Sequence, residues 1–174
     1  MGTTATSQQE FLERTWPYQA ALRHVARAYS ANVADREDLL QDIWLQLWRS
    51  YPSFRGEAAY STFVYRISLN TAIAGRRRAS RRPALETGAD LDRVAATTSP
   101  PSSVETEELF SAIRNLRPID RALVILSLEE RSYAEMADVL GVSVKAVGVR
   151  LARAKDRLRH LLSPPWRSQW MIGN

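Results

Sequence analysis

Cysteine is absent from this chain, and histidine occurs only twice, at His24 and His160. Without a thiol, the protein can form neither a disulfide nor a thiolate metal site. The two histidines are far apart in the sequence, so each is better explained as a surface or packing residue than as a metal ligand. No paired carboxylates and no glycine-rich phosphate loop stand out. We therefore do not expect an enzyme, and we expect no catalytic residue, no metal and no cofactor.

Long apolar runs are also missing. No run approaches the ~18 residues that cross a bilayer, and the polar first twenty residues, interrupted by Pro17, do not form a secretory signal. The expectation is a cytoplasmic protein without membrane insertion. A hydrophobic content of 45% over 174 residues suits one or two small globular domains. The net charge of +5 favours a polyanionic partner, although charge alone does not separate nucleic acid from a membrane surface.

Apolar residues recur at helical spacing nearly everywhere, and no alternating strand pattern is convincing. The sequence therefore predicts an all-α protein. Before residue 132 the expected helices cover about 22–29, 40–51, 63–74, 105–116 and a segment that begins at Pro118.

One stretch breaks this periodicity. Residues 83–103 are dominated by Pro, Ser, Thr, Gly and Ala, which is the composition of a flexible linker. We therefore expect two small helical domains, at 10–82 and 104–162, and a tail at 163–174 of unexplained role.

Residues 132–160 predict two helices joined by a tight turn. Ser132 and Glu135 have the spacing of a capping box at the start of the first helix. Gly141 can adopt the left-handed conformation that ends it, and Ser143 can cap the second helix. The first helix has an apolar face made of Met136, Ala137 and Leu140.

The second helix of this pair is basic. Its expected buried stripe is Val147, Leu151, Ala154, Leu158, Leu161 and Leu162. Its other faces carry Lys145, Arg150, Arg153, Lys155, Arg157 and Arg159. This is the geometry that places a helix in the DNA major groove. The alternative is a basic helical hairpin with a solvated face.

Charge and aromatic residues are segregated along the first half of the chain. Residues 35–42 are acidic, which suggests a basic protein partner or an ordinary solvated helix face, and residues 76–82 carry five arginines. Within residues 54–72, four aromatic side chains alternate with Arg55 and Arg66. Rings beside cations suit unpaired bases, which stack on the rings while the cations hold the backbone. A helix core would explain the same rings, and the residues alone leave the two explanations open.

Three segments in this order resemble a known family. They are DREDLLQDIWLQLW, FRGEAAYSTFVYRISLNTA and LRPIDRALVILSLEERSYAEMADVLGVSVKAVGVRLARAKDRLRHLL. Over roughly residues 15–162 the chain resembles an extracytoplasmic-function (ECF) sigma factor, a short two-domain member of the sigma-70 family. The resemblance implies a protein that joins core RNA polymerase at its clamp helices and flap, recognises the −10 and −35 elements of promoter DNA, and opens the duplex. It also implies an anti-sigma factor or another regulator as a partner.

The resemblance implies roles for particular residues. Those facing core polymerase would be Asp38, Leu39, Gln41, Asp42 and Trp48. Those at the −10 element would be Arg55, Gly56, Tyr60, Phe63, Arg66, Asn70, Arg76, Arg77 and Arg78. Those at the −35 element would be Ser143, Lys145, Ala146, Val149, Arg150, Arg153 and Lys155.

The chain departs from the family pattern at a few of these places. Phe63 stands where a Trp is usual, Gly148 where a Lys or Arg is common, Val149 where a Ser is common, and Ala152 where a larger side chain is frequent. We expect −35 readout to be reduced, or to rely on cations, on DNA shape and on apolar contact with thymine methyl groups. A homodimeric helix-turn-helix regulator is the alternative function. It would explain residues 132–160 but not the other segments.

Overall fold

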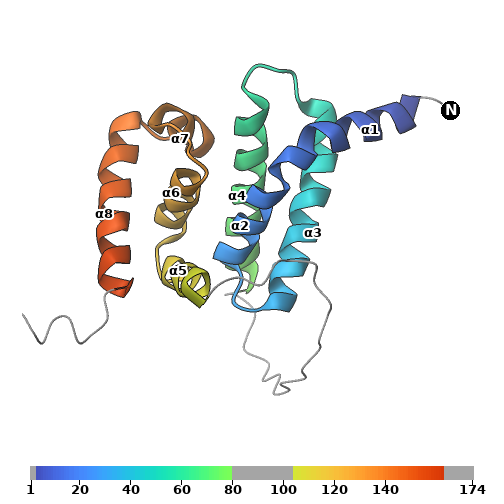
Figure 1. Cartoon of the computed structure of the whole chain (residues 1–174). Helices are drawn as coiled ribbons and strands as arrows, with labels where there is room; N and C mark the ends of the chain where they lie inside the picture. Colours follow the sequence, from blue (N-terminus) through green and yellow to red (C-terminus); the bar gives the residue numbers. More distant parts are fainter. Residues whose placement is uncertain (1–2, 80–103, 163–174) are drawn as a thin grey trace, which may run out of the picture.

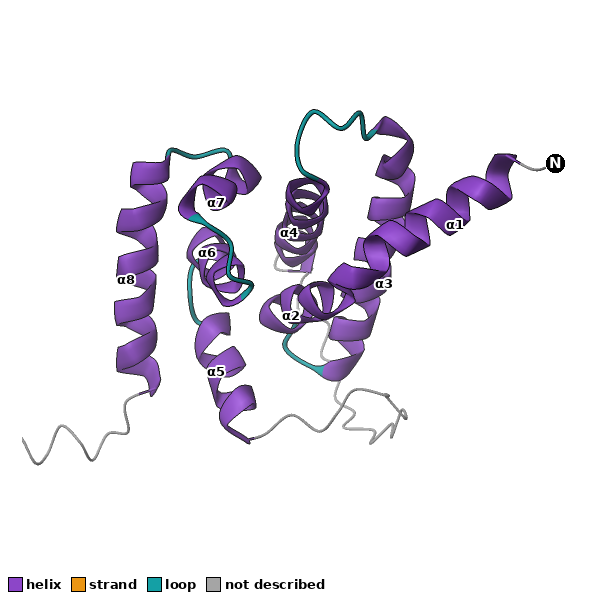
Figure 2. Cartoon of the chain, turned by 45° about the horizontal axis from the view of Figure 1, so that its top comes forward, coloured by secondary structure: helices purple, strands orange, loops and turns teal. Residues whose placement is uncertain are grey.

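The computed structural model describes residues 3–79 and 104–162, and within these ranges it contains only helices (Figure 1, Figure 2). The all-α prediction is confirmed. The expected linker and tail lie outside the described residues. The first half of the fold consists of α1 (Thr3–Thr15), η1 (Trp16–Tyr18), α2 (Gln19–Tyr29), α3 (Val33–Ser50), η2 (Tyr51–Ser53) and α4 (Tyr60–Ala79). The second half consists of α5 (Val104–Arg114), α6 (Pro118–Leu128), α7 (Tyr133–Leu140) and α8 (Val144–Leu162). Across the described ranges, no helix combines the length and apolar character that a membrane span requires.

The first half is a bundle of α2, α3 and α4 around fully buried aliphatic side chains. Asn32 begins α3, because its side-chain oxygen accepts a hydrogen bond from the Asp35 N–H at 2.8 Å. Pro52 lies in the short 3-10 helix η2 that follows α3. The sequence did not predict α1. That helix packs on the bundle through Phe11, whose ring meets those of Trp44, Trp48 and Tyr51 edge-on.

The caps expected in the second half are present. Ser132 and Glu135 form the reciprocal capping box. Gly141 has a φ of +66°, a backbone conformation that residues other than glycine adopt only at a cost in free energy. The Ser143 hydroxyl oxygen accepts from the Ala146 N–H at 3.2 Å. The four residues that the sequence predicted as caps, which form three caps, therefore act as predicted.

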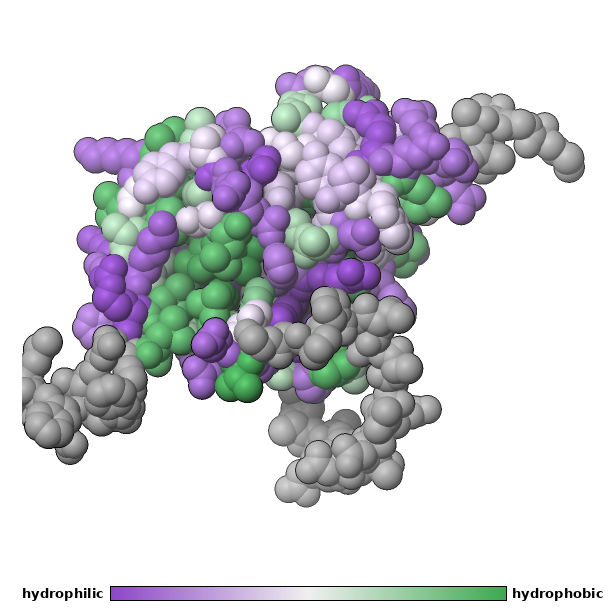
Figure 3. All heavy atoms as spheres, in the orientation of Figure 1, coloured by the Kyte–Doolittle hydropathy of each residue, from purple (hydrophilic) through white to green (hydrophobic). Residues whose placement is uncertain are grey.

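The buried stripe of α8 is shorter than predicted. It contains Val147, Leu151, Ala154 and Leu158. Leu161 and Leu162 are 44% and 42% exposed, because no described element covers the last turn of α8. Figure 3 shows apolar surface gathered in this part of the second half, between α8 and α5–α6, within an otherwise largely hydrophilic face.

The two halves pack against each other. α7 lies against α4, and α5 and α6 lie against α2. The buried residues of both halves belong to one continuous cluster. Periodicity along the chain had indicated two helical bodies, but it gave no sign of this contact.

Candidate nucleic-acid interface

Aromatic rings gather where η2 leads into α4. Tyr60, the first residue of α4, lies 5.1 Å from Phe54 and 5.6 Å from Phe63 between ring centroids. The Arg14 guanidinium sits 4.5 Å from the centroid of the Tyr60 ring. The Tyr60 hydroxyl hydrogen-bonds Thr15 at 2.7 Å, and burial raises the pKa of Tyr60. Tyr60 is therefore a neutral side chain that connects the loop between η2 and α4 to the end of α1, through its contacts with Phe54 and Thr15.

Beside this cluster lies an open cavity of about 370 Å³. It is lined by Ser53, Phe54, Arg55, Glu57, Ala58, Phe63, Arg66 and Ile67. The structure therefore brings Arg55, Phe63 and Arg66 together around one space, as a base-binding site would require. The loop can turn at its rim because Gly56 adopts a φ of +77°.

Other residues predicted for the −10 element lie elsewhere. Tyr60 is not among the lining residues of the cavity. Asn70 is exposed further along α4. Arg76 lies ten residues beyond Arg66, which is about 15 Å along a helix axis. The side chains of Arg77 and Arg78 are outside the described part of the chain. Of the α4 arginines whose side chains the structure describes, Arg66 thus lines this cavity and Arg76 does not.

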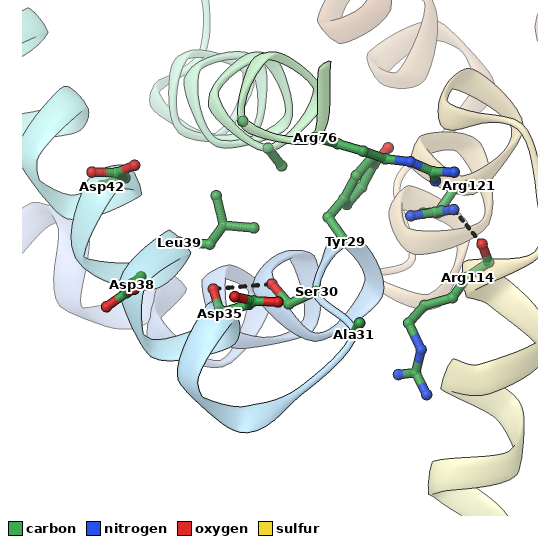
Figure 4. A pocket seen from close by; sticks show the side chains of 12 residues that line it. Tyr29, Ser30, Ala31, Asp35, Asp38, Leu39, Asp42, Arg76, Arg114 and Arg121 are labelled. Carbon is green, nitrogen blue, oxygen red and sulfur yellow. Dashed lines mark hydrogen bonds between the residues drawn. The ribbon is translucent and has the colours of Figure 1, made fainter. Parts of the chain in front are cut away.

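Arg76 instead lines a second cavity, of about 480 Å³, at the junction of the two halves (Figure 4). Figure 4 shows Arg76 reaching from α4 toward Tyr29 and Arg121. Arg121 is 1% exposed, and its guanidinium donates to the carbonyl oxygens of Ala28, Arg114 and Leu116. Because burial and the nearby positive charge of Arg76 disfavour its charged form, the pKa of Arg121 falls to about 10. The sequence did not predict the role of Arg121. Hydrophobic periodicity describes the faces of one helix and cannot show which group of another helix a buried charged residue contacts.

The acidic helix α3 borders the same cavity. Three polar residues of α3 are exposed to solvent and so accessible to a partner: Asp38, Gln41 and Asp42. Of these, Asp38 and Asp42 line the cavity. Leu39 points toward α4, where its Cδ1 lies 3.9 Å from the position that a Cβ on Gly75 would occupy. Trp48 is partly buried against Phe11, at 5.1 Å between ring centroids. The polar residues predicted to contact polymerase are therefore exposed. The two apolar ones, Leu39 and Trp48, are partly buried by packing within the first half.

Helix α8 exposes the positions predicted to meet DNA. Its exposed cations include Lys145, Arg150, Arg153 and Lys155, whereas Ala146 is half-buried and Ser143 serves as the cap. Apolar side chains are exposed among these cations: Val144 is 50% and Val149 46% exposed, and Ala152 is also exposed. The ring of Tyr133 of α7 packs on Gly148 of the same helix as these residues. Val144 and Tyr133 were not among the predicted residues. Counting outward positions from the Ser143 cap could have found Val144.

Comparison with known proteins identifies the family of this chain. The family model of sigma-70 region 2 matches residues 17–82, and the family model of sigma-70 region 4 matches residues 106–158. The chain is 32% identical to the ECF RNA polymerase sigma factor SigM of Mycobacterium tuberculosis over 143 residues, covering 81% of this chain and 71% of SigM. It is 29% identical to SigG of the same organism, covering 86% of this chain but only 48% of SigG, so it spans about half the length of that relative.

The fold also matches a solved structure. The sigma factor RpoE of Bartonella quintana, crystallised with the anti-sigma factor NepR, superposes with a TM-score of 0.71 at 24% identity, over 88% of this chain and 97% of RpoE. Matches to both sigma-70 regions, in order and together with close sequence relatives, establish that the chain belongs to the ECF branch of the sigma-70 family.

Proposed function

We propose that this chain is an alternative sigma factor that binds core RNA polymerase, recognises promoter −10 and −35 elements, and opens the DNA to start transcription. The observation that carries this proposal is the cavity beside the loop before α4. It joins an aromatic wall, Phe63, to two cations, Arg55 and Arg66, in the part of the chain that matches region 2.

At the −10 element, this cavity would receive a base flipped out of the duplex. Unstacking a base step costs a few kcal/mol. Enclosing the base beside Phe63 and neutralising neighbouring phosphates with Arg55 and Arg66 would offset much of that cost. Opening would thus be driven by binding, without ATP hydrolysis. We propose that the protein acts as a non-enzymatic initiation factor in the cytoplasm.

At the −35 element, α8 would lie in the major groove. The proposed phosphate and base contacts come from Ser143, Lys145, Ala146, Arg150, Arg153 and Lys155. Val149 and Val144, which are both about half exposed, would contact thymine methyl groups, which are the apolar feature of that groove. This arrangement would replace the polar readout lost at Gly148 and Val149 with apolar readout.

On the protein side, Asp38, Gln41 and Asp42 would face basic residues of the polymerase clamp. Exposed charge pairs of this kind set orientation and association rate more than affinity. Leu39 and Trp48 would add apolar contact at the edges. A protein regulator is a further proposed partner, because the similar RpoE was crystallised with an anti-sigma factor.

The decisive experiment is reconstituted transcription. The purified chain is mixed with bacterial core RNA polymerase and a library of random promoter templates, and the 5′ ends of the transcripts are sequenced. We expect initiation at defined points downstream of two shared elements. Failure to start on any template, together with dimeric binding to a palindromic operator without polymerase, would favour the helix-turn-helix regulator instead.

A further inference from the structure

Arginine side chains from three helices line the cavity at the junction of the two halves (Figure 4). This arginine cluster consists of Arg76 of α4, Arg114 at the end of α5 and Arg121 of α6. Arg114 donates through Nη2 to Glu107 at 3.0 Å. Among the described residues, no ion pair joins Arg76 or Arg121 to a carboxylate. The cluster therefore carries more positive charge than its carboxylate partner offsets.

Arg121 is the deepest member of the cluster. Its side chain is 1% exposed, and its guanidinium carbon lies 4.8 Å from the centroid of the Tyr29 ring. Its terminal nitrogens donate to backbone carbonyls, but its buried Nε has no acceptor in the described part of the chain. The same is true of the buried Nη1 of Arg114. Buried N–H donors are nearly always paired, so two donors that still need an acceptor at one cavity are a feature of an anion site.

The positive charge of the cluster is held at a cost. Burial and the nearby charge of Arg76 both lower the pKa of Arg121. A bound anion would accept hydrogen bonds from the cluster and would offset the repulsion between its members. The planar guanidinium matches the oxygen geometry of phosphate. Several arginines also suit the double charge of phosphate better than the single charge of a carboxylate.

The opposite wall of the cavity is acidic. It is formed by Asp35, Asp38 and Asp42 of α3 (Figure 4). Within residues 3–79 and 104–162, no ion pair links these carboxylates to the arginine cluster. The acidic wall would repel a polyanion that extended across the cavity, whereas a compact phosphate could bind at the arginine wall alone. The cavity of about 480 Å³ also has room for a small group esterified to that phosphate.

We propose that the arginine cluster binds one phosphate group, either as the free ion or as the monoester of a small molecule. The exposed Arg76 would close over the ligand, and the Nε of Arg121 would donate to it from the buried side. Because Arg76 belongs to α4 and Arg121 to α6, the ligand would bridge the two halves and stabilise the folded chain. This site is independent of the proposed sigma-factor function, since its test needs only the free protein.

Thermal unfolding of the free full-length chain is the first test. Sodium phosphate, or glycerol 3-phosphate in a parallel series, replaces sodium chloride at constant ionic strength. We expect a saturable rise in Tm of about 3 °C or more. The series with the lower midpoint identifies the form of the ligand.

Two matched variants assign the rise to the cluster. Arg76→Gln should lose at least half of it. Arg49→Gln, the same change at an exposed residue that does not line the cavity, should retain it. An unchanged Tm in the wild type, or an equal rise in all three proteins, would overturn the proposal.

Nitrogen-15 NMR locates the anion within the protein. The signal of the Arg121 Nε–H group is assigned through its contacts with the Tyr29 ring. We expect phosphate to shift this signal with the midpoint of the Tm series, and tripolyphosphate to need at least a threefold higher concentration. Attraction by the net charge of +5 alone would give the opposite order. That order, or a signal that does not move when the Tm rise is saturated, would overturn the site.

Discussion

Gly148 of α8 lies against the ring of Tyr133 of α7. A Cβ at position 148 would be 3.5 Å from Tyr133 Cε2, which is an ordinary van der Waals contact. A larger residue would therefore fit at position 148. A glycine in the middle of a helix lowers the stability of that helix relative to alanine. The Tyr133 ring covers the helix surface at Gly148.

This contact predicts that Gly148→Ala stabilises the protein. Alanine favours a helix interior by about 1 kcal/mol over glycine, and the new methyl group meets Tyr133 without a clash. We expect the free energy of unfolding, measured by urea denaturation, to rise by about that amount. Gly141→Ala is the control, because its φ of +66° strains any side chain and should lower stability. A loss of stability in both variants would contradict the prediction.

Apolar readout of the −35 element can be tested on the DNA. Replacing a thymine by deoxyuridine removes only the C5-methyl group that Val149 would contact. Burial of one such group contributes about 0.8 kcal/mol, so each contacted thymine should lose about fourfold in holoenzyme affinity. In Val149→Ser the same DNA substitution should have little further effect. Deoxyuridine outside both elements serves as the control, and equal losses in the wild type and the variant would exclude Val149 as the reader.

Local sequence patterns predicted most helices because each has a buried face, and side-chain caps mark the starts of α3, α7 and α8. Helix α1 was missed because its stretch is polar and packs mainly through one aromatic side chain, Phe11. The exposure of Leu161 and Leu162 was also missed, since periodicity does not tell where the covering helices end.

The junction could not be predicted for a different reason. Two of its bonds run from arginines to backbone carbonyls, Arg66 to Asp138 and Arg121 to Ala28. Every residue has a backbone carbonyl, so the residue types in the sequence do not show which residue an arginine will contact. The cavity beside Phe63 was anticipated in part, because Arg55, Phe63 and Arg66 are close in sequence as well as in space. Arg76 was grouped with them through the family resemblance, and the helix carries it to the junction.

Asp42→Arg is expected to slow assembly with core polymerase while leaving the fold intact. Asp42 is exposed, so reversing its charge disturbs little inside the protein but sets like charge against the proposed basic clamp surface. We expect the association rate to fall about tenfold at low salt, with a smaller effect at high salt. Glu13→Arg, the same reversal on exposed α1, is the control. An unchanged association rate for Asp42→Arg, with circular dichroism like that of the wild type, would remove α3 from the polymerase interface.

The pH dependence of stability should carry a signature of Glu107. Burial alone would raise the pKa of this carboxyl, but hydrogen bonds from Arg27 and Arg114 outweigh it and hold the pKa below its ordinary value. A lowered folded-state pKa stabilises the fold above the unfolded pKa, which is about 4.3, and this contribution is lost as the pH falls through the folded pKa. The loss of unfolding free energy between pH 6 and pH 3 should therefore be smaller in Glu107→Gln than in the wild type. Glu108→Gln, at the exposed neighbouring residue, should follow the wild-type curve. Identical curves for Glu107→Gln and the wild type would show that the Arg27–Glu107 pair is not closed in solution.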